Sequence, residues 1–517
     1  MRKPHSLLSS LGLLASTVGV ALPTTTALGQ DDPPASGLES AEIDPFDPGA
    51  EKTAAERWRG LRRLERIQYF SNIATLEGSP TLLPVRPWDT SLDLSTPRPR
   101  PLGHAPVDAL LGDPLEPVLR PWRAMGEVAL DQLGLNTSAY YTLLYQNVSD
   151  PTSGNPRNLG TGRLDVNLVW NLWDEDRSTT SLLQDSAEGH GLIGILVRQG
   201  NQIGSPQDVS TQTSAGSSQT LDCLYSGPNG GPATLNLLYF QQGWASDRLV
   251  VSVGKIHPNQ YIGLNFWAND ESRQFLAGPF DGIQALGSSQ GGYQLGVAVQ
   301  AVPTDSIFVN AVVTDALGRP DNMFSTLDEG CIWTAAELGC VLPIDEKRWG
   351  GPTAVSLIWA GQNLDALATT PQKAWSNAIA FQWQGHLTEQ LGYWAQGGWS
   401  EDRMSTTNAG VSVGLGIDRP FGREGDLFGI AYNWSRPTDR ETSSNQVRFV
   451  GLGYNDLFQS TPSTPSPRPQ SLVEMFYRIQ LTDSMQLTPD VQVVFDPASR
   501  NDTDTVVVLG LRLTTDF

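Results

Sequence analysis

Apolar and polar side chains alternate along most of the chain after about residue 136, in segments of roughly ten residues each. Polar stretches rich in Gly, Asn, Asp and Pro separate these segments. In the last segment, apolar side chains occupy every second position, and Gly510, Arg512 and Thr514 fall between them. A period of two residues is that of a β-strand with one apolar face. The pattern therefore predicts an all-β domain of antiparallel strands.

A strand with one apolar and one charged face fits two kinds of protein. In a soluble sandwich the apolar face lines the core, whereas in an outer-membrane barrel it meets lipid and the polar face lines a wet lumen. Three features favour the barrel: abundant Trp, a terminal Phe517 that closes an alternating strand, and short connections that alternate with long ones. Several of the 15 tryptophans stand near predicted strand ends, namely Trp170, Trp383, Trp399 and Trp434. We therefore expect a transmembrane antiparallel β-barrel.

The parity of the turns sets the number of strands. The alternating segments number fifteen, and residues 445–454 are a further candidate. Four short connections, at residues 244–247, 302–305, 387–389 and 481–483, look like turns on one rim, so an even number of strands must separate them. This parity requires one more strand between residues 306 and 386 and places 445–454 in a loop. The count becomes about sixteen, within the even-numbered range of such barrels.

The first 125 residues lack the alternation. Arg2 and Lys3, a largely apolar run and the small residues around Ala27 are typical of a signal peptide over residues 1–29. Residues 30–125 are expected to form a periplasmic, partly helical and proline-rich N-terminal region. It contains a predicted linker over 78–121 and an amphipathic helix whose apolar positions are Trp58, Leu61, Leu64 and Ile67. A second short helix is predicted from Pro121 to Leu133, and the barrel domain is assigned to residues 126–517.

Composition and motifs narrow the function classes. The 517 residues carry a net charge of −21, because 55 Asp and Glu outnumber 34 Lys and Arg, and phosphate contacts need clustered basic residues. We therefore expect no nucleic-acid partner. The four histidines after the signal peptide do not have metal-binding spacing, and no nucleophile elbow or phosphate-binding loop stands between a strand and a helix. We expect no enzymatic activity, cofactor or metal site.

The three cysteines are interpreted from the expected compartment. An exported chain meets oxidising conditions, in which Cys331 and Cys340 are close enough in sequence to pair, leaving Cys223 over. Two unpaired thiols are the alternative. We predict the Cys331–Cys340 disulfide.

Two sequence blocks resemble a known family. The run from Val253-Gly254-Lys255 through Phe266-Trp267-Ala268-Asn269-Asp270-Glu271 to Gln274-Phe275 is similar to a signature of the OprB-type carbohydrate-selective porin family. The stretch from Ser471 to Pro497, together with Leu509-Gly510-Leu511-Arg512 and Phe517, resembles the closing hairpin of the same family. The resemblance covers residues 126–517 and implies a diffusion channel for small hydrophilic solutes, particularly sugars, in an outer membrane.

A candidate pore-lining segment follows from the predicted turns. If the short turns at 244–247 and 302–305 are periplasmic, the segment from Ile256 to Leu286 is an outward loop that is long enough to fold into the pore. Aromatic faces, amides and charges suit sugar passage, because they stack on C–H faces and replace water at hydroxyls. The candidate lining residues of this region are Lys255, Asn259, Tyr261, Trp267, Asn269, Asp270, Glu271, Arg273 and Gln274.

Other interpretations of the same residues stay open. Asn269-Asp270-Glu271 is also how a short helix begins, with Asn269 as its cap, and this loop would then be structural packing. Glu474 and Arg478 share one strand face and are candidates for a lumenal charge ladder with Arg512, while a barrel-stabilising ion pair is as plausible.

Three functions remain compatible with the sequence. The first is a porin that passes small hydrophilic solutes, with outer-membrane lipid as its surroundings and, by analogy with porins, a homotrimer. The second is an envelope anchor whose N-terminal region contacts peptidoglycan while the pore is general or closed. The third is a secreted soluble β-protein that binds or cleaves sugars.

Overall fold

The computed structural model describes one helix and the barrel that follows it. The described residues are 110–174, 190–204, 209–224, 233–244, 248–287, 292–304, 306–316, 327–342, 353–364, 373–388, 390–423, 425–438, 468–498 and 500–517. The predicted signal peptide, the predicted helix around Trp58 and most of the predicted linker lie outside the described residues.

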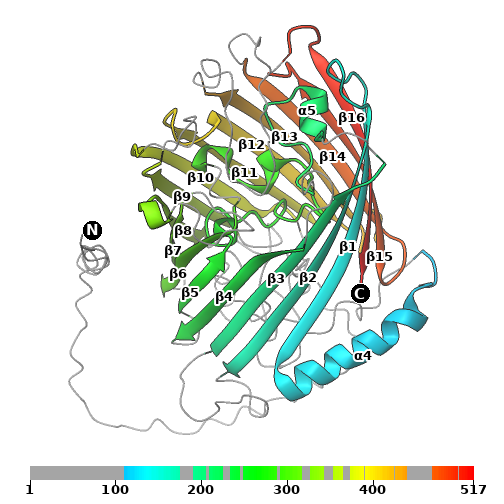
Figure 1. Cartoon of the computed structure of the whole chain (residues 1–517), viewed down its shortest axis with the longest axis vertical. Helices are drawn as coiled ribbons and strands as arrows, with labels where there is room; N and C mark the ends of the chain where they lie inside the picture. Colours follow the sequence, from blue (N-terminus) through cyan, green and yellow to red (C-terminus); the bar gives the residue numbers. More distant parts are fainter. Residues whose placement is uncertain are drawn as a thin grey trace, which may run out of the picture. The chain divides into compact units, whose positions relative to one another are not determined.

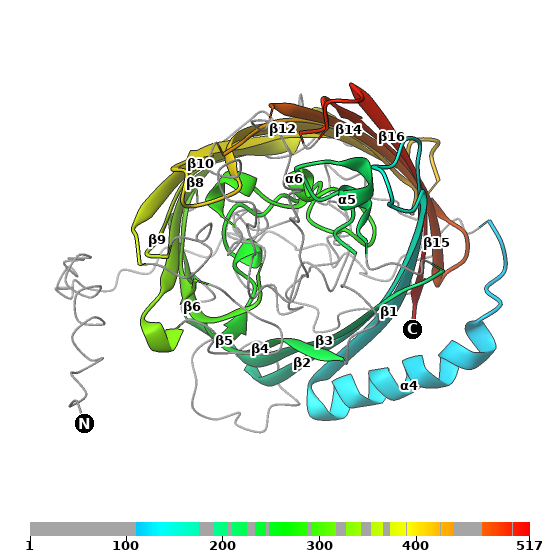
Figure 2. The same ribbon diagram turned by 45° about the horizontal axis from the view of Figure 1, so that its top comes forward.

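Sixteen strands form a closed antiparallel barrel, as the sequence predicts. Each strand pairs with its neighbours in sequence, and β1 closes the wall on β16 with Tyr140 opposite Asp516 (Figures 1 and 2). The strands are β1 (Leu135–Val148), β2 (Asn158–Asp174), β3 (His190–Gln202), β4 (Thr234–Trp244), β5 (Leu249–Ile256), β6 (Gln294–Thr304), β7 (Ile307–Asp315), β8 (Ile332–Leu342), β9 (Thr353–Gln362), β10 (Ser376–His386), β11 (Leu391–Ser400), β12 (Thr407–Asp418), β13 (Leu427–Pro437), β14 (Gln470–Gln480), β15 (Met485–Phe495) and β16 (Thr505–Asp516).

The alternation in the sequence corresponds to the two faces of the wall. Along β16, Arg512 and Thr514 are buried inside the barrel, while Leu509 and Leu511 are 51% and 47% exposed on its outside. Outward tryptophans gather towards both rims and include Trp170, Trp244, Trp359, Trp375, Trp399 and Trp434. An apolar outer face between aromatic girdles is what a barrel in lipid requires.

The strand missing from the alternating segments is β8, in the interval where parity requires it. Its inward positions are Trp333, Ala335 and Glu337, and Ala336 faces outward between them. Two adjacent alanines give almost no contrast between the faces, which explains why the period is hard to see. The candidate strand at 445–454 lies outside the described residues.

The connections differ between the two rims. Tight turns join β6 to β7, β10 to β11 and β14 to β15, and we call this end the short-turn rim. The opposite end carries longer connections, among them those after β3 and β5, and we call it the long-loop rim. In outer-membrane barrels the short turns face the periplasm.

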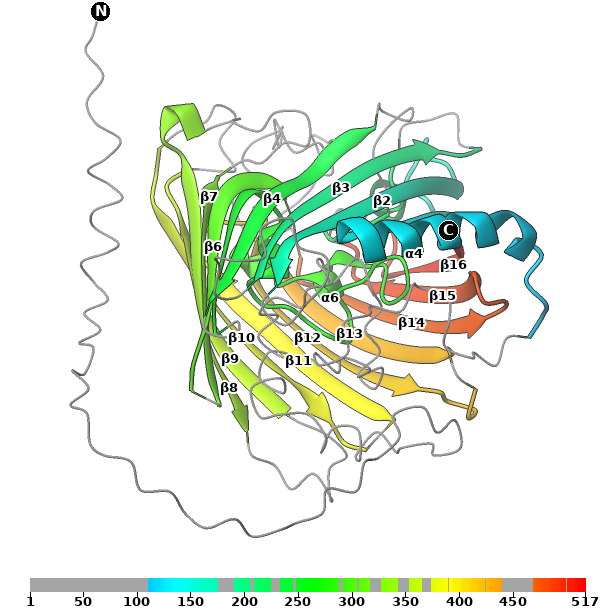
Figure 3. The same cartoon turned by 90° about the horizontal axis from the view of Figure 1, so that it is seen from below.

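Helix α4 (Glu116–Leu133) precedes the barrel and lies outside its wall, beside the beginning of β1 (Figures 1, 2 and 3). It begins five residues before the predicted helix start at Pro121, inside the segment predicted as linker. The chain just before it is tied to the short-turn rim, since Leu111 N donates to Leu481 O at 2.8 Å. None of the helices in the described residues combines the length and the apolar character needed to cross a membrane.

The predicted disulfide is wrong, because all three cysteines are free thiols. Cys331 directly precedes β8, and Cys340 is near the end of the same strand. A strand rises about 3.3 Å per residue, so the two positions lie roughly 30 Å apart, whereas a disulfide joins Cα atoms that are at most about 7 Å apart. Residues that are close in sequence lie far apart in space when the chain between them is an extended strand.

Candidate functional site

The connection between β5 and β6 folds back into the barrel, where its described residues are 257–287 and 292–293 (Figure 2). It contains the short helices η1 (Pro258–Gln260), α6 (Gly278–Asp281) and η2 (Gln284–Leu286). We call it the inner loop. A loop away from bulk water must find partners for its backbone groups.

Amide side chains of the wall supply those partners. Gln382 Nε2 donates to Gly263 O at 3.1 Å, and Gln384 Nε2 donates to Leu264 O at 2.9 Å. On the next strand, Gln396 Nε2 lies within 3.2 to 3.3 Å of the carbonyl oxygens of Pro279, Phe280 and Gly282. Inward glutamines on β10 and β11 therefore fix the path of the inner loop.

Trp267 anchors the middle of the inner loop. Its ring lies over Gly392 of β11 and Gly416 of β12, and a β-carbon at either position would overlap the ring. It also meets His386 edge to face, with ring centroids 5.3 Å apart. Trp267 is thus a buried packing residue of the loop, only 3% exposed.

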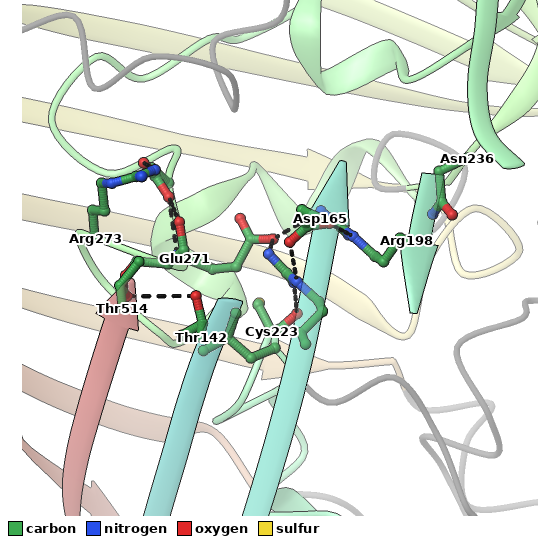
Figure 4. A network of polar contacts seen from close by, with 12 residues as sticks. Thr142, Asp165, Arg198, Cys223, Asn236, Glu271, Arg273 and Thr514 are labelled. Carbon is green, nitrogen blue, oxygen red and sulfur yellow. Dashed lines mark hydrogen bonds and ion pairs between the residues drawn. The ribbon is translucent and has the colours of Figure 1, made fainter. Parts of the chain in front are cut away.

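Glu271 is the centre of an ion network between the inner loop and the wall (Figure 4). Its Oε1 lies 2.7 Å from Arg163 of β2 and 3.6 Å from Arg198 of β3. Both arginines also pair with Asp165, Arg163 through its Nε at 2.7 Å. Burial alone would raise the pKa of Glu271, but the charges of Arg163 and Arg198 outweigh it and lower this pKa to about 2.

Two further arginines connect the loop to the wall, Arg273 from the loop and Arg512 from β16. Arg273 pairs with Asp516 and lies 3.7 Å from Asp270 Oδ2, and its guanidinium stands over the Tyr140 ring at 4.7 Å. Arg512 of β16 donates to the carbonyl oxygens of Glu271 and Gln274, the latter at 2.7 Å. The predicted loop residues Glu271, Arg273 and Gln274 are therefore brought together with the predicted wall residue Arg512.

Glu474, Arg478 and Arg512, predicted to form a lumenal charge ladder, each make hydrogen bonds with backbone groups. The Glu474 carboxylate instead accepts from the backbone N–H groups of Leu276 and Ala277, at 2.6 and 3.0 Å. Arg478 lies at the short-turn end of β14, where its Nε donates to Gly425 O at 3.3 Å. Glu474 and Arg512 thus hold neighbouring parts of the inner loop, while Arg478 serves the rim.

The helix considered at Asn269 is absent, because Asp270 makes a turn. Asp270 Oδ1 accepts from Ser272 N at 2.9 Å and from Ser272 Oγ at 2.5 Å. Gln274 bridges this turn, donating to Phe266 O at 3.1 Å and accepting from Asp270 N at 3.1 Å. Asn269 accepts from Asn265 N at 3.4 Å. Local side-chain bonds of this kind compete with helix formation.

The three remaining candidates lie at the end of β5, for Lys255, and at the beginning of the inner loop, for Asn259 and Tyr261. Lys255 Nζ donates to Leu235 O at 2.7 Å, and Asn259 Nδ2 donates to Asp281 O at 2.8 Å. Tyr261 is buried, and burial raises its pKa to about 12. These residues lie apart from the Glu271 network along the loop, so the candidates divide into two groups.

A second inward segment was not foreseen from the sequence. Residues 209–224, which include α5 (Thr211–Ala215), pack against the inner loop: Cys223 N donates to Leu276 O at 3.0 Å and Gly278 N to Thr220 O at 3.1 Å. The inner wall is apolar where Leu221 packs, in a cluster that includes Val148, Val494 and Val506. A lumenal face predicted as polar is thus apolar where this segment covers it.

Arg163, Asp165 and Arg198 complete the site but were not among the predicted residues. Arg163 and Asp165 show in the sequence as the charged face of a strand. Arg198 is harder to find, because the inward positions of β3 before it are Leu192, Gly194 and Leu196, so both faces of this strand are apolar. The folded loop places Glu271 opposite β2 and β3. Only this placement distinguishes Arg163, Asp165 and Arg198 from other charged residues that face the lumen.

The polar groups of the inner loop and the wall are arranged in a way that suits reversible contact with a polar solute more than catalysis of a covalent reaction. It juxtaposes guanidinium groups, carboxylates, amides and aromatic rings inside a closed wall. Within the described ranges, no three His, Cys, Asp or Glu side chains gather in a way that could hold a metal ion.

Comparisons with known proteins agree with this architecture. The model of the OprB family, described as carbohydrate-selective porins, matches residues 353–517. Porin AaxA of Chlamydia abortus is 22% identical over 291 residues, which are 54% of this chain and 56% of the relative, so the chain spans about half the length of that curated protein.

The fold can be compared with a solved structure. The high-pH structure of Pseudomonas putida OprB matches with a TM-score of 0.59 and 14% identity, covering 77% of this chain and 97% of that one. Such an identity supports the fold alone. Residues 353–517 thus match the model of the carbohydrate-selective porin family OprB, and the described barrel has the fold of the Pseudomonas putida OprB structure.

Proposed function

We propose that the protein is an outer-membrane porin through which small hydrophilic solutes, carbohydrates in particular, diffuse passively past the inner loop. The single observation that carries the proposal is the inward course of residues 257–287, which bring Glu271 to Arg163 and Arg198 inside a closed barrel. The match of the carbohydrate-selective porin model to residues 353–517 adds support for carbohydrates as the solute class.

The physical basis is the solvation of the wall and of the solute. A closed barrel pairs its backbone groups from strand to strand, so it can stand in lipid without unsatisfied N–H or C=O groups. A loop folded inside narrows the passage and replaces bulk water with fixed polar groups. A sugar then exchanges water for side-chain partners reversibly, and no bond is made or broken.

The fixed charges give the narrowed region its character. Glu271 and Asp165 face Arg163 and Arg198 across a short distance, so opposite charges lie side by side in the lumen. A neutral, hydroxyl-rich solute that passes this region meets paired charges rather than a charge of one sign. An ion of either sign meets both attraction and repulsion. This pattern favours neutral polar solutes over ions.

Planar-bilayer recordings test the proposal. Purified, detergent-folded protein is inserted, and maltose or glucose is titrated against the open-channel current. We expect steady conductance that sugar reduces saturably. Conductance indifferent to sugar would overturn the carbohydrate proposal. The absence of any conductance would overturn the porin proposal and favour the envelope anchor, in which residues 30–125 contact peptidoglycan.

We also propose a homotrimer as the assembly, by analogy with porins. Light scattering in detergent tests it, with three chains per particle expected. A monodisperse single chain would contradict it.

A further inference from the structure

Helix α4 (Glu116–Leu133) presents an apolar face to its surroundings. Val118, Trp122 and Met125 are 64%, 65% and 62% exposed, and Val128 and Leu133 are also exposed. Val118, Trp122, Met125 and Val128 recur every three or four positions, so they share one side of the helix. A helix that packed its apolar stripe on its own domain would bury these side chains.

The helix has two other sides. Leu119 is only 3% exposed, and Gly126 lies against β1, where an added β-carbon would be 3.6 Å from Thr137 Oγ1. This side faces the barrel wall. The side that bears Glu116 and Arg120 is polar. Arg123 lies between this polar side and the barrel side, and it pairs with Glu116 at 2.7 Å. The apolar and polar sides are therefore opposite each other, with the barrel side between.

The barrel side of the helix is set by Leu119 and Gly126. A helix turns by about 100° per residue, so the apolar side with Trp122 and Met125 and the polar side with Arg120 and Glu116 face in opposite directions along the wall. In Figure 1, α4 runs from right to left outside the barrel, near the C-terminus.

The helix lies at the level of an aromatic girdle. Trp170, an outward residue near the short-turn end of β2, donates its indole N–H to Leu133 O at 3.0 Å. Trp244 ends β4 at the same rim and is also exposed outward. Outward tryptophans at a strand end mark the boundary between hydrocarbon and headgroups. The apolar side of α4 is therefore continuous with the lipid-facing surface of the barrel.

We propose that α4 is an interfacial helix whose apolar face rests in the phospholipid of the periplasmic leaflet. An amphipathic helix that lies parallel to the membrane plane, with its polar side towards water, has the geometry of such helices. Arg120 is on the polar side, where a guanidinium can reach lipid phosphate. This inference requires the barrel to stand in a membrane but not that it conducts sugars.

Site-specific quenching tests the placement of α4. The full chain, with C223S, C331S and C340S, carries either M125C on the apolar side or R120C on the polar side, each labelled with a bimane fluorophore. The labelled proteins are folded into phosphatidylglycerol and phosphatidylethanolamine vesicles. Lipids brominated near the glycerol end report contact with the acyl boundary, and aqueous iodide reports contact with water. Heat-modifiable mobility of each variant shows that the barrel is folded.

We expect brominated lipid to quench the label of M125C at least about twofold more than that of R120C, and iodide to show the reverse order. Equal quenching of both labels by iodide, with no effect of the lipid, would overturn the proposal. Shielding of the M125C label from both quenchers, with cross-linking between chains, would also overturn it, because a second copy would then cover this face.

A second measurement keeps the native cysteines. Brominated lipid should quench the intrinsic fluorescence of the wild-type protein more than that of W122F, because Trp122 is expected in the lipid boundary. Identical quenching of the two proteins would contradict the proposal even if the cysteine-free chain failed to fold.

Discussion

The Glu271 carboxylate, together with Asp165, balances the positive charges of Arg163 and Arg198 inside the barrel. In Glu271→Gln, Arg163 and Arg198 keep their charges and their pairing with Asp165 but lose the Glu271 carboxylate. Removing one partner of a buried ion pair costs about 3 to 5 kcal/mol, which should loosen the inner loop. We expect the ratio of cation to anion permeability to fall, measured as a reversal potential in a potassium chloride gradient.

The matched control is Glu329→Gln. Glu329 is exposed in the connection between β7 and β8, so this variant removes the same charge at the long-loop rim. It should leave the reversal potential near the wild-type value. Equal shifts in both variants would contradict a specific role of Glu271.

The pH dependence of the loop follows from the pKa of Glu271, which its two arginines lower to about 2. A carboxylate whose pKa is lower in the folded than in the unfolded state stabilises the fold above the unfolded value, and this stabilisation disappears as the pH falls through the folded one. The Glu271 contribution should therefore be constant from about pH 7 to 5 and be lost between about pH 4.5 and 2.

Single-channel conductance and current noise recorded over this range measure the effect. Glu271→Gln should lack the acid transition that the wild-type protein shows. A wild-type transition near pH 6 that the substitution abolished would show that Glu271 is not held by the arginines.

The cysteines give a prediction that is independent of conductance. With Cys331 and Cys340 at opposite ends of β8, the chain should contain three free thiols. Alkylation under denaturing, non-reducing conditions followed by mass measurement should add three labels per chain. Prior reduction should not change that number, and a gain of two labels on reduction would restore the disulfide.

At the scale of elements, the fit between the inner loop and the wall depends on glycines under Trp267. Gly392→Ala places a methyl group where the indole ring lies, so the loop must move away from β11. We expect larger conductance, weaker block by sugar and easier proteolysis of the loop. Gly410→Ala is the control, because its new β-carbon meets no atom closer than 3.5 Å. If both variants behaved like the wild type, the packing of Trp267 would not set the passage.

The elements also show what a linear pattern can reveal. Strands with a polar lumenal face, such as β14 and β15, are recognised because lipid requires one apolar face and water the other. The same reasoning misses β8, whose alanines show little contrast. It finds β3 as a strand but does not single out Arg198, because the lumenal positions before it are Leu and Gly. The apolar inner surface near Val148 and Val506 reflects residues 209–224, a partner that the wall sequence alone does not reveal.

At the scale of the whole molecule, the parity of the turns predicted the number of strands better than the pattern of single segments did. The sixteen-strand closed barrel was predicted because turns on one rim must be an even number of strands apart. Site partners were harder to predict, since Glu271 meets Arg163 across 108 positions of sequence and Arg512 across 241. Such pairs depend on closure of the barrel and on the path of a loop inside it. The Cys331–Cys340 pairing failed for the converse reason, because the residues between them form one extended strand.

Solute flux through the reconstituted protein tests the central claim most directly. Liposomes that contain the protein are diluted into isotonic glucose, maltose or raffinose, and the swelling rate is followed by light scattering. The account predicts protein-dependent swelling that slows as the sugar grows, with Gly392→Ala reducing this dependence on size while Gly410→Ala does not. Swelling no faster than in protein-free liposomes, or rates that do not depend on sugar size, would contradict a sugar-permeable barrel narrowed by its inner loop.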